Sequence, residues 1–261
     1  GGKAVLAVAI CLTPLLFGFV IPASQLLWWA VFEAEPLGWD FVGLAWNSFS
    51  LAFMAALLAV TLAIILSYAK RAKPIKPVRT AIAMAGFGYA LPGTIIAIGV
   101  LIPLAWVDHG LIDLFESLGW DSPGLLLSGS LVALLFAYTV RFLAVALGSV
   151  QAGLEQIKPS LDHAGRSMGH RPLTILRKIH VPLMRSSILT AVLIVFVDVL
   201  KELPATLILR PFNFNTMAVR AYELASDERL VDAAPASIMI VMVGLIPVLL
   251  LHASIVRRRP H

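Results

Sequence analysis

Long apolar runs alternate with short polar segments along this chain, and the pattern predicts membrane-spanning helices. A window of about 20 residues, the length that crosses a bilayer core, finds six apolar segments. They lie at residues 4–29, 41–68, 78–106, 124–150, 184–207 and 234–256. Polar stretches rich in proline, glycine or charge separate them. We therefore expect an all-α membrane protein, residues 1–261, with one domain of six transmembrane helices.

The composition agrees with a membrane location. Hydrophobic residues make up 59% of the chain and charged residues 13%, and the mean hydropathy is +0.91. Soluble domains carry about 25% charged residues. The single cysteine, Cys11, has no partner for an intrachain disulfide.

The charged residues sort by loop and predict the orientation of the spans. Segments 69–80 and 151–185 and the arginine run 257–259 are basic, whereas 30–40 and 107–123 contain acids and no Lys or Arg. Because Lys and Arg favour the cytoplasmic side, we expect the basic segments and both termini of this chain in the cytoplasm. The sequence pI near 9.6 then reflects topology and attraction to anionic lipid, and we expect no nucleic-acid partner.

One polar segment, SLDHAGRSMGHRPLTILRKIHVP at residues 160–182, stands between the fourth and fifth apolar runs. Its pattern predicts a short helix with Asp162 near the positive N-terminal end, ended by Gly169. A second helix is expected from Pro172, a residue tolerated at a first helical position, until Pro182 ends it. The segment is either a helical hairpin that projects from the membrane or a basic connector that lies on lipid headgroups.

The spacing within this hairpin resembles the cytoplasmic motif of ABC-importer permeases: Glu-Ala-Ala, three residues, Gly, nine residues, Ile-x-Leu-Pro. The matching positions, aligned on the central glycine, are His163, Ala164, Gly165, Gly169, Ile179, Val181 and Pro182. Histidine, glycine and valine replace the family's glutamate, second alanine and leucine, and Asp162 lies one residue before the missing glutamate. The resemblance implies a coupling helix that carries ATP-driven motion into the spans. The residues it assigns to ATPase coupling are Asp162, His163, Ala164, Gly165, Arg166, Gly169, Ile179 and Pro182.

Two further stretches resemble the permeases of ferric-iron importers. They are YTVRFLAVALGS at 138–149 and the long stretch 195–230, and the similarity extends over about 138–256. This resemblance implies an iron(III) importer of the bacterial inner membrane, with this chain as the C-terminal six-helix half of a longer protein or as a separate subunit. Permeases for thiamine, polyamines, sulfate and molybdate share the frame, so these cargoes stay open.

The same resemblance implies the partners. They are two cytoplasmic ABC ATPase subunits that hold ATP and Mg, a second permease half or homologous permease, and a periplasmic substrate-binding protein. The chain has no Walker A, HExxH or GxSxG motif, and its histidines lack metal-ligand spacing. We therefore expect no enzyme activity, cofactor or metal site in this chain. The rival from another class is a secondary transporter driven by an ion gradient.

Ionisable residues inside the predicted spans form a second candidate site. Asp198, Lys201 and Glu202 are spaced by three and four residues, which predicts one helical face, and Arg141 lies in the preceding span. Charges in a span usually face protein or water. The group is either an architectural ion-pair cluster or a polar lining of the translocation path or its outer gate.

Pro92 and Gly93 interrupt the third predicted span. A proline–glycine break is either a kink that neighbouring helices satisfy or a hinge with an unwound turn that lines the path. We treat both residues as candidates for the path or gate.

Overall fold

The computed structural model describes residues 2–36 and 38–256, and every regular element within them is helical. Short π- or 3₁₀-helical segments are labelled η. The first half contains α1 (Gly2–Leu15), η1 (Leu16–Val20), α2 (Ile21–Trp28), η2 (Trp29–Glu33), α3 (Trp39–Ala72), α4 (Lys76–Ala85), η3 (Gly86–Ala90) and α5 (Gly93–Ser117). The second half contains α6 (Leu131–Glu155), α7 (Pro159–Ser167), α8 (Pro172–Ile175), η4 (Leu176–His180), α9 (Val181–Leu183), α10 (Arg185–Leu200), α11 (Pro204–Leu209), α12 (Met217–Ser226) and α13 (Leu230–Val256).

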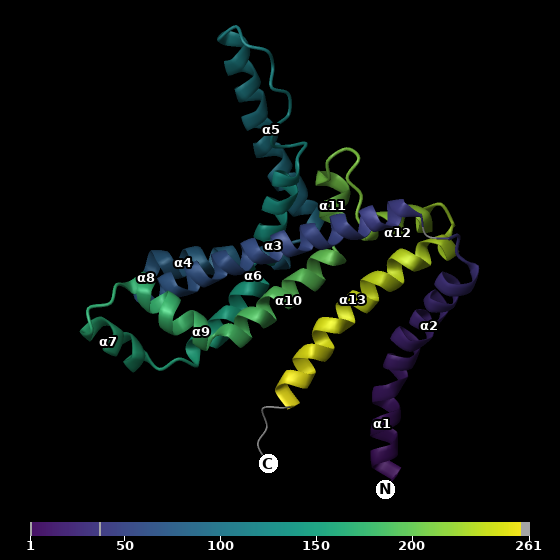
Figure 1. The fold of residues 1–261 in the computed structure, drawn as a ribbon, viewed down its shortest axis with the longest axis horizontal. Coiled ribbons are helices and arrows are strands. Elements are labelled where there is room, and N and C mark those ends of the chain that lie inside the picture. Colours follow the sequence, from purple (N-terminus) through teal and green to yellow (C-terminus); the bar gives the residue numbers. More distant parts are fainter. Residues whose placement is uncertain (1, 37, 257–261) are drawn as a thin grey trace.

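Helices α3, α6 and α10 pack against one another and form the centre of the molecule (Figure 1). Small side chains make this packing possible, because they let helix backbones approach closely where lipid supplies no hydrophobic drive. The buried alanines of the two longest central helices are Ala52, Ala55, Ala56, Ala59 and Ala63 of α3 and Ala133, Ala137 and Ala146 of α6. The result is a continuous hydrophobic core that extends to Ile157 and Met184, on either side of the polar hairpin.

The first and last helices lie at the edge of this core. Helix α13 packs against α2, η2 and α12. No side chain of the most apolar stretch of Gly2–Glu33 is buried within the described structure. Figure 1 shows the start of α1 and the end of α13 on the same side of the molecule. The arginines at 257–259, on which part of the predicted orientation rests, lie outside the described residues.

Four helical segments of the described chain are long and apolar enough to cross a membrane: Gly2–Glu33, Trp39–Ala72, Gly93–Ser117 and Leu131–Glu155. A fifth is reached if Pro172–Leu183 and Arg185–Leu200, bent by 77°, count as one span. Leu230–Ile246 is a shorter apolar helix by the same measure. The all-α membrane fold is confirmed, and the six-span arrangement stays a prediction.

The third apolar run is interrupted where the sequence predicts, at Pro92 and Gly93. Over 78–106 the chain forms α4 and η3, breaks at Leu91, and starts α5 at Gly93. Leu91 is extended, with φ −86° and ψ 141°, because the ring of Pro92 disfavours helical angles in the residue before it. The break therefore separates a polar α4 from the apolar α5.

The segment 107–123, predicted as an acidic loop, is largely helical, because α5 continues to Ser117. The carboxylate of Asp108 is buried and accepts hydrogen bonds from the backbone N of Leu127 (3.0 Å) and of Ser128 (2.7 Å) and from the Ser128 hydroxyl (2.6 Å). These bonds hold residues 124–130 as a loop against α5, so the fourth long helix begins at Leu131 rather than at 124.

Candidate functional site

The polar segment folds as the predicted helical hairpin. Helix α7 is followed by Gly169, whose φ of +78° is the left-handed conformation that glycine adopts without a steric penalty. The second arm begins at Pro172 and runs through α8, η4 and α9 to Met184, where the chain bends by 77° into α10. Pro182 does not end this arm, which corrects the sequence prediction. It lies in the first turn of α9, where a missing N–H costs little.

The two arms of the hairpin pack closely at Gly165. A Cβ atom there would lie 3.0 Å from both Cγ1 and Cδ1 of Ile175. Both residues are buried. The glycine that replaces the family's second alanine therefore leaves room for Ile175, which closes the hairpin on itself.

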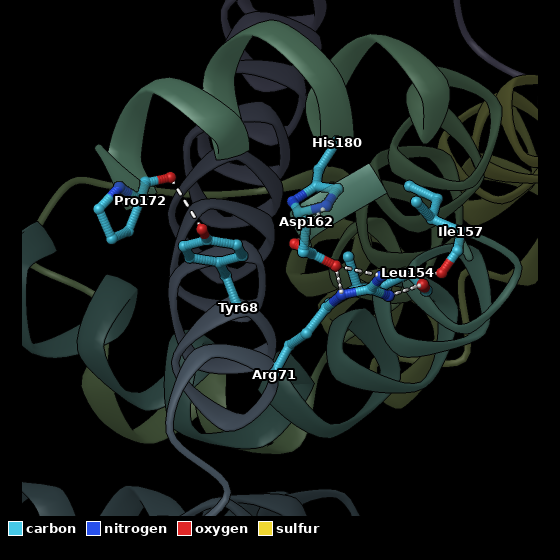
Figure 2. Close-up of polar contacts among 7 residues, drawn as sticks. All are labelled: Tyr68, Arg71, Leu154, Ile157, Asp162, Pro172 and His180. Atoms are coloured by element: carbon cyan, nitrogen blue, oxygen red, sulfur yellow. Dashed lines mark hydrogen bonds and ion pairs between the residues drawn. The ribbon is translucent and has the colours of Figure 1, made fainter. Parts of the chain in front are cut away.

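Asp162 lies inside the hairpin rather than on its outer surface (Figure 2). Its Oδ2 atom accepts hydrogen bonds from Nε (2.9 Å) and Nη2 (2.6 Å) of Arg71, at the end of α3. Its Oδ1 atom lies 3.1 Å from Nε2 of His180 in η4. One carboxylate thus joins α3, α7 and η4, and it is not free to contact a separate subunit.

Arg71 also binds the end of α6. Its Nη1 donates to the carbonyl of Leu154 (2.6 Å) and its Nη2 to the carbonyl of Ile157 (2.8 Å). The last carbonyls of a helix have no partner within it, so the guanidinium satisfies groups that would otherwise need water. Tyr68, one turn earlier in α3, donates its hydroxyl to the carbonyl of Pro172 (2.8 Å) at the start of α8. Both arms of the hairpin are therefore tied to α3.

His180 is fully buried beside Asp162. Burial lowers the pKa of its imidazole, although the carboxylate of Asp162 acts in the opposite direction. The ring is therefore held largely neutral at neutral pH.

The remaining matched positions divide between the surface and the interior. His163, Ala164, Arg166, Gly169 and Pro182 are exposed, and Ile179 is half-buried. At the elbow, Met168 (66% exposed) and Leu173 (73% exposed) present apolar side chains to the outside. Nothing in the sequence pattern indicates the contacts of Arg71, Tyr68 or His180. Arg71 is one of several cations in the basic segment 69–80, and its local pattern does not distinguish it from Lys70.

A second polar cluster joins the breaks of two helices in the bundle. Arg141 of α6 donates through Nη1 to the carbonyl of Leu91 (2.7 Å), which the break before α5 leaves free. Its Nε lies 3.2 Å from Oε2 of Glu202, which follows α10. This nitrogen has no hydrogen bond of good geometry within the described residues, so the ion pair is close but not well aligned.

Glu202 is buried and also organises the start of α11. Its Oε1 accepts from the backbone N of Ala205 (3.3 Å), and its carbonyl accepts from the hydroxyl of Thr206, which is also in contact with the hydroxyl of Tyr138. A Cβ atom at Gly93 would overlap this carboxylate. Gly93 therefore gives Glu202 the space to reach Arg141.

Asp198, Lys201 and Glu202 do not share one helical face, which corrects the sequence prediction. Helix α10 ends at Leu200, and the backbone of Lys201 is no longer helical, with φ −97° and ψ 0°. Lys201 pairs with Asp198 at 2.9 Å and is 63% exposed, whereas Glu202 turns inward to Arg141. The structure brings together Arg141, Glu202 and Gly93, and leaves the Asp198–Lys201 pair separate.

Within residues 2–36 and 38–256, no group of three or more His, Cys, Asp or Glu side chains is placed to hold a metal ion. The polar chemistry of both sites is that of ion pairs and helix-end carbonyls. Such an arrangement can fix helices relative to one another and can open when an ion pair breaks.

Comparison with known proteins places this architecture among transport proteins. The chain is 28% identical over 163 residues to the Fe(3+)-transport system permease protein FbpB 2 of Haemophilus influenzae, an alignment that covers 62% of this chain and 29% of that protein. It is 23% identical over 208 residues to a putative 2-aminoethylphosphonate transport system permease protein, PhnV, of Salmonella typhimurium, covering 78% of this chain and 72% of the relative. The chain thus spans less than a third of the length of the first relative.

Two solved structures share the fold. One is a bacterial ABC transporter involved in the import of the acidic polysaccharide alginate, with a TM-score of 0.69, 17% identity and coverage of 99% of this chain and 98% of that one. The other is the MetNI methionine ABC transporter in an inward-facing conformation, with a TM-score of 0.56, 16% identity and coverage of 83% and 99%. The family model for binding-protein-dependent transport system inner membrane components matches residues 79–259, which include the hairpin and both breaks. This chain belongs to that family of inner-membrane transport components.

Proposed function

We propose that this chain is the permease subunit of an ABC importer that moves cargo across the inner membrane by alternating access, driven by a separate ATPase. The observation that carries the proposal is the contact of Arg71 with Asp162 and with the end of α6. A force on the hairpin reaches α3 and α6 directly, because the guanidinium of Arg71, on α3, binds both the Asp162 carboxylate of the hairpin and a carbonyl at the end of α6. A connector resting on headgroups has no need of such a clamp.

The exposed elbow is the surface that we assign to the ATPase subunit. Met168 and Leu173 offer apolar contacts, and His163 and Arg166, exposed on the same hairpin, offer polar ones. Protein interfaces combine apolar and polar contacts of this kind. We assign this end to the cytoplasm, because Lys and Arg of the kind found in these loops favour that side. In the assembly that we propose, two ATPase subunits hold ATP and Mg, a second permease half completes the path, and a periplasmic binding protein delivers the cargo.

Arg141 and Glu202 are our candidates for a gate within the path. Arg141 connects the break before α5 with the break after α10, so rupture of its pair with Glu202 would let these two breaks move apart. Pro92 and Gly93 belong to the same site, since one creates the free carbonyl and the other makes space for the carboxylate.

For the cargo we propose iron(III), on the similarity to the Haemophilus iron permease and on the stretches 138–149 and 195–230. The second candidate is 2-aminoethylphosphonate, because the PhnV relative aligns with a larger share of this chain. Uptake of radiolabelled iron(III) and of 2-aminoethylphosphonate into cells that express the complete transporter distinguishes the two. Uptake that persists without ATP but follows an ion gradient would favour a secondary transporter instead.

Site-specific crosslinking tests the role of the hairpin. In a Cys11→Ser background, Met168→Cys and Leu173→Cys should each crosslink to the ATPase subunit. Phe212→Cys, still more exposed at 95% but on the loop between α11 and α12, is the control and should not. Crosslinks from Phe212 alone, or from none of the three in an actively transporting complex, would contradict the assignment.

A further inference from the structure

A cavity of about 760 Å³ opens between the end of α3, α4 with η3, and the second half of α6. It is separate from the elbow of the hairpin and from the Arg141–Glu202 pair, and it shares only Arg71 and Leu154 with the contact that ties the hairpin to α6. One end of its lining is polar and carries charge, and the other is apolar. A lining with one polar, charged part and one apolar part suits an amphipathic molecule.

The polar end of the cavity has an excess of positive charge. Lys70, Arg71 and Arg79 line it together with one acid, Glu155. Arg71 is paired with Asp162, whereas Lys70 and Arg79 have no ion pair within the described part of the chain. Lys70 has only a long hydrogen bond, 3.4 Å, to Gln151. Two cations are therefore available to an anionic group.

A buried hydroxyl points to a missing partner at the same place. Ser67 lines the cavity, is 2% exposed, and its Oγ has no hydrogen-bond partner within the described residues. An unsatisfied buried polar group costs about 1–3 kcal/mol. An acceptor oxygen in the cavity would remove that cost.

The opposite wall suits a hydrocarbon chain. Ile82 and Ala83 of α4 and Ala144 and Leu147 of α6 line it with apolar side chains, and Gly148 adds no side chain. Since the neighbouring α3 and α6 are apolar enough to span a membrane, lipid is the amphipathic molecule present at highest concentration around this wall.

We propose that this cavity binds one anionic phospholipid of the phosphatidylglycerol type. The phosphate lies between Lys70 and Arg79 within reach of Ser67, the headgroup hydroxyls donate to Glu155 and Gln151, and an acyl chain follows the apolar wall. Basic pockets between transmembrane helices bind anionic headgroups by this combination of charge and chain contact. The site requires only that the chain is in a membrane and does not depend on the transport function proposed above.

Native mass spectrometry of the purified, assembled transporter tests the headgroup contact, with phosphatidylglycerol added back after delipidation. The double variant Lys70→Gln/Arg79→Gln should weaken binding of one lipid per chain by about thirtyfold. The matched control, Lys73→Gln/Lys76→Gln, removes the same charge from the same loop outside the cavity lining and should leave that lipid bound. Equal losses in both variants would reduce the effect to general surface charge and would overturn the site.

A second variant tests the apolar wall without changing charge. A Cβ at Gly148 meets nothing within 4 Å, so a side chain has room to start there, and Gly148→Leu should displace the lipid while the complex stays assembled. Retention of the lipid by Gly148→Leu would exclude a chain in the cavity. Displacement by an equal concentration of soluble glycerophosphoglycerol would assign the site to a free phosphate ester and overturn the lipid proposal.

Discussion

The Arg71–Asp162 and Arg141–Glu202 pairs each join separate helices, and they are built differently. At the hairpin, Arg71 makes two hydrogen bonds to Asp162 and two more to carbonyls at the end of α6. In the bundle, Arg141 makes one hydrogen bond to Leu91 and approaches Glu202 without a well-aligned second bond. Arg71 uses all three of its guanidinium nitrogens in hydrogen bonds, whereas Nε of Arg141 has no well-aligned bond within the described residues.

This difference matches the tasks that we propose for the two sites. A fully hydrogen-bonded buried ion pair resists separation, because breaking it strands a charge and several carbonyls at once. A pair with unused hydrogen-bonding capacity loses less when it opens. The hairpin is suited to transmit a displacement without deforming, and the Arg141–Glu202 pair is suited to yield to it.

The largest effect is expected from Arg71→Gln, which removes the more fully hydrogen-bonded of the two pairs, Arg71–Asp162. The change strands the Asp162 carboxylate and removes donors from two carbonyls, for a loss of about 3–5 kcal/mol in hairpin stability. Thermal unfolding of the purified complex should show the loss, and stimulation of ATP hydrolysis by loaded binding protein should disappear.

Two variants control this experiment. Arg71→Gln/Asp162→Asn removes both charges and should recover part of the lost stability, because no buried charge is left unpaired. Arg177→Gln changes an exposed arginine of the same hairpin and should behave as wild type. If Arg71→Gln unfolds at the wild-type temperature and couples normally, the clamp is not a structural element.

Glu202→Gln tests the weaker pair and should have the smaller effect on stability, about 2 kcal/mol. The amide can still accept from the backbone N of Ala205, but Arg141 loses its counter-charge. We expect folded yield to stay near normal while uptake falls. An exchange of the two charges would not restore uptake, since a carboxylate at 141 cannot donate to the carbonyl of Leu91. Normal uptake in Glu202→Gln would remove this pair from the gate.

Gly169→Val changes the elbow of the hairpin and leaves its ion pair intact, so it separates the role of the elbow from that of the Arg71–Asp162 pair. The φ of +78° penalises a β-branched residue by about 1–2 kcal/mol, which alters the elbow and leaves Arg71 and Asp162 in place. Membrane insertion and subunit yield should be unchanged, and coupling to the ATPase should weaken. Full uptake and full stimulation of hydrolysis would show that coupling does not depend on the angle of the elbow.

The smallest effect concerns His180 and appears only on acidification. Because burial lowers the pKa of this histidine in the folded protein, the folded hairpin disfavours protonation, and its stability falls as the pH drops below the unfolded value near 6.5. His180→Gln should lose less stability than wild type between about pH 7.5 and pH 5.5. His163→Gln, an exposed neighbour, is the control and should follow wild type.

Several features of the site were predictable because they depend on neighbours in the chain. Gly169 and Pro172 mark the elbow through their own backbone preferences, and the spacing to Pro182 identified the hairpin. The prediction that the arm ends at Pro182 was wrong. The proline lies in the first turn of α9, directly after the π-helical turn η4, and the arm continues to Met184. Local rules for proline assume an ordinary helix before it.

The partners of charged residues were not predictable in the same way. The sequence placed Arg141 near Glu202 only as neighbours in adjacent spans, and it grouped Lys201 with Glu202 because it assumed that the helix continues. Arg71 and His180 meet Asp162 from positions 91 and 18 residues away in the chain. No periodicity encodes which of several loop cations will reach a given acid.

By itself, the sequence determined the membrane class, the helical content and the place of the hairpin, since hydrophobic length and glycine and proline angles act within about twenty residues. Only the tertiary structure decided which carbonyls are left free at the helix breaks and which arginine satisfies each of them. The physical reason is that a buried charge is stabilised by groups in space rather than in sequence, and the packing of α3, α6 and α10 sets those distances.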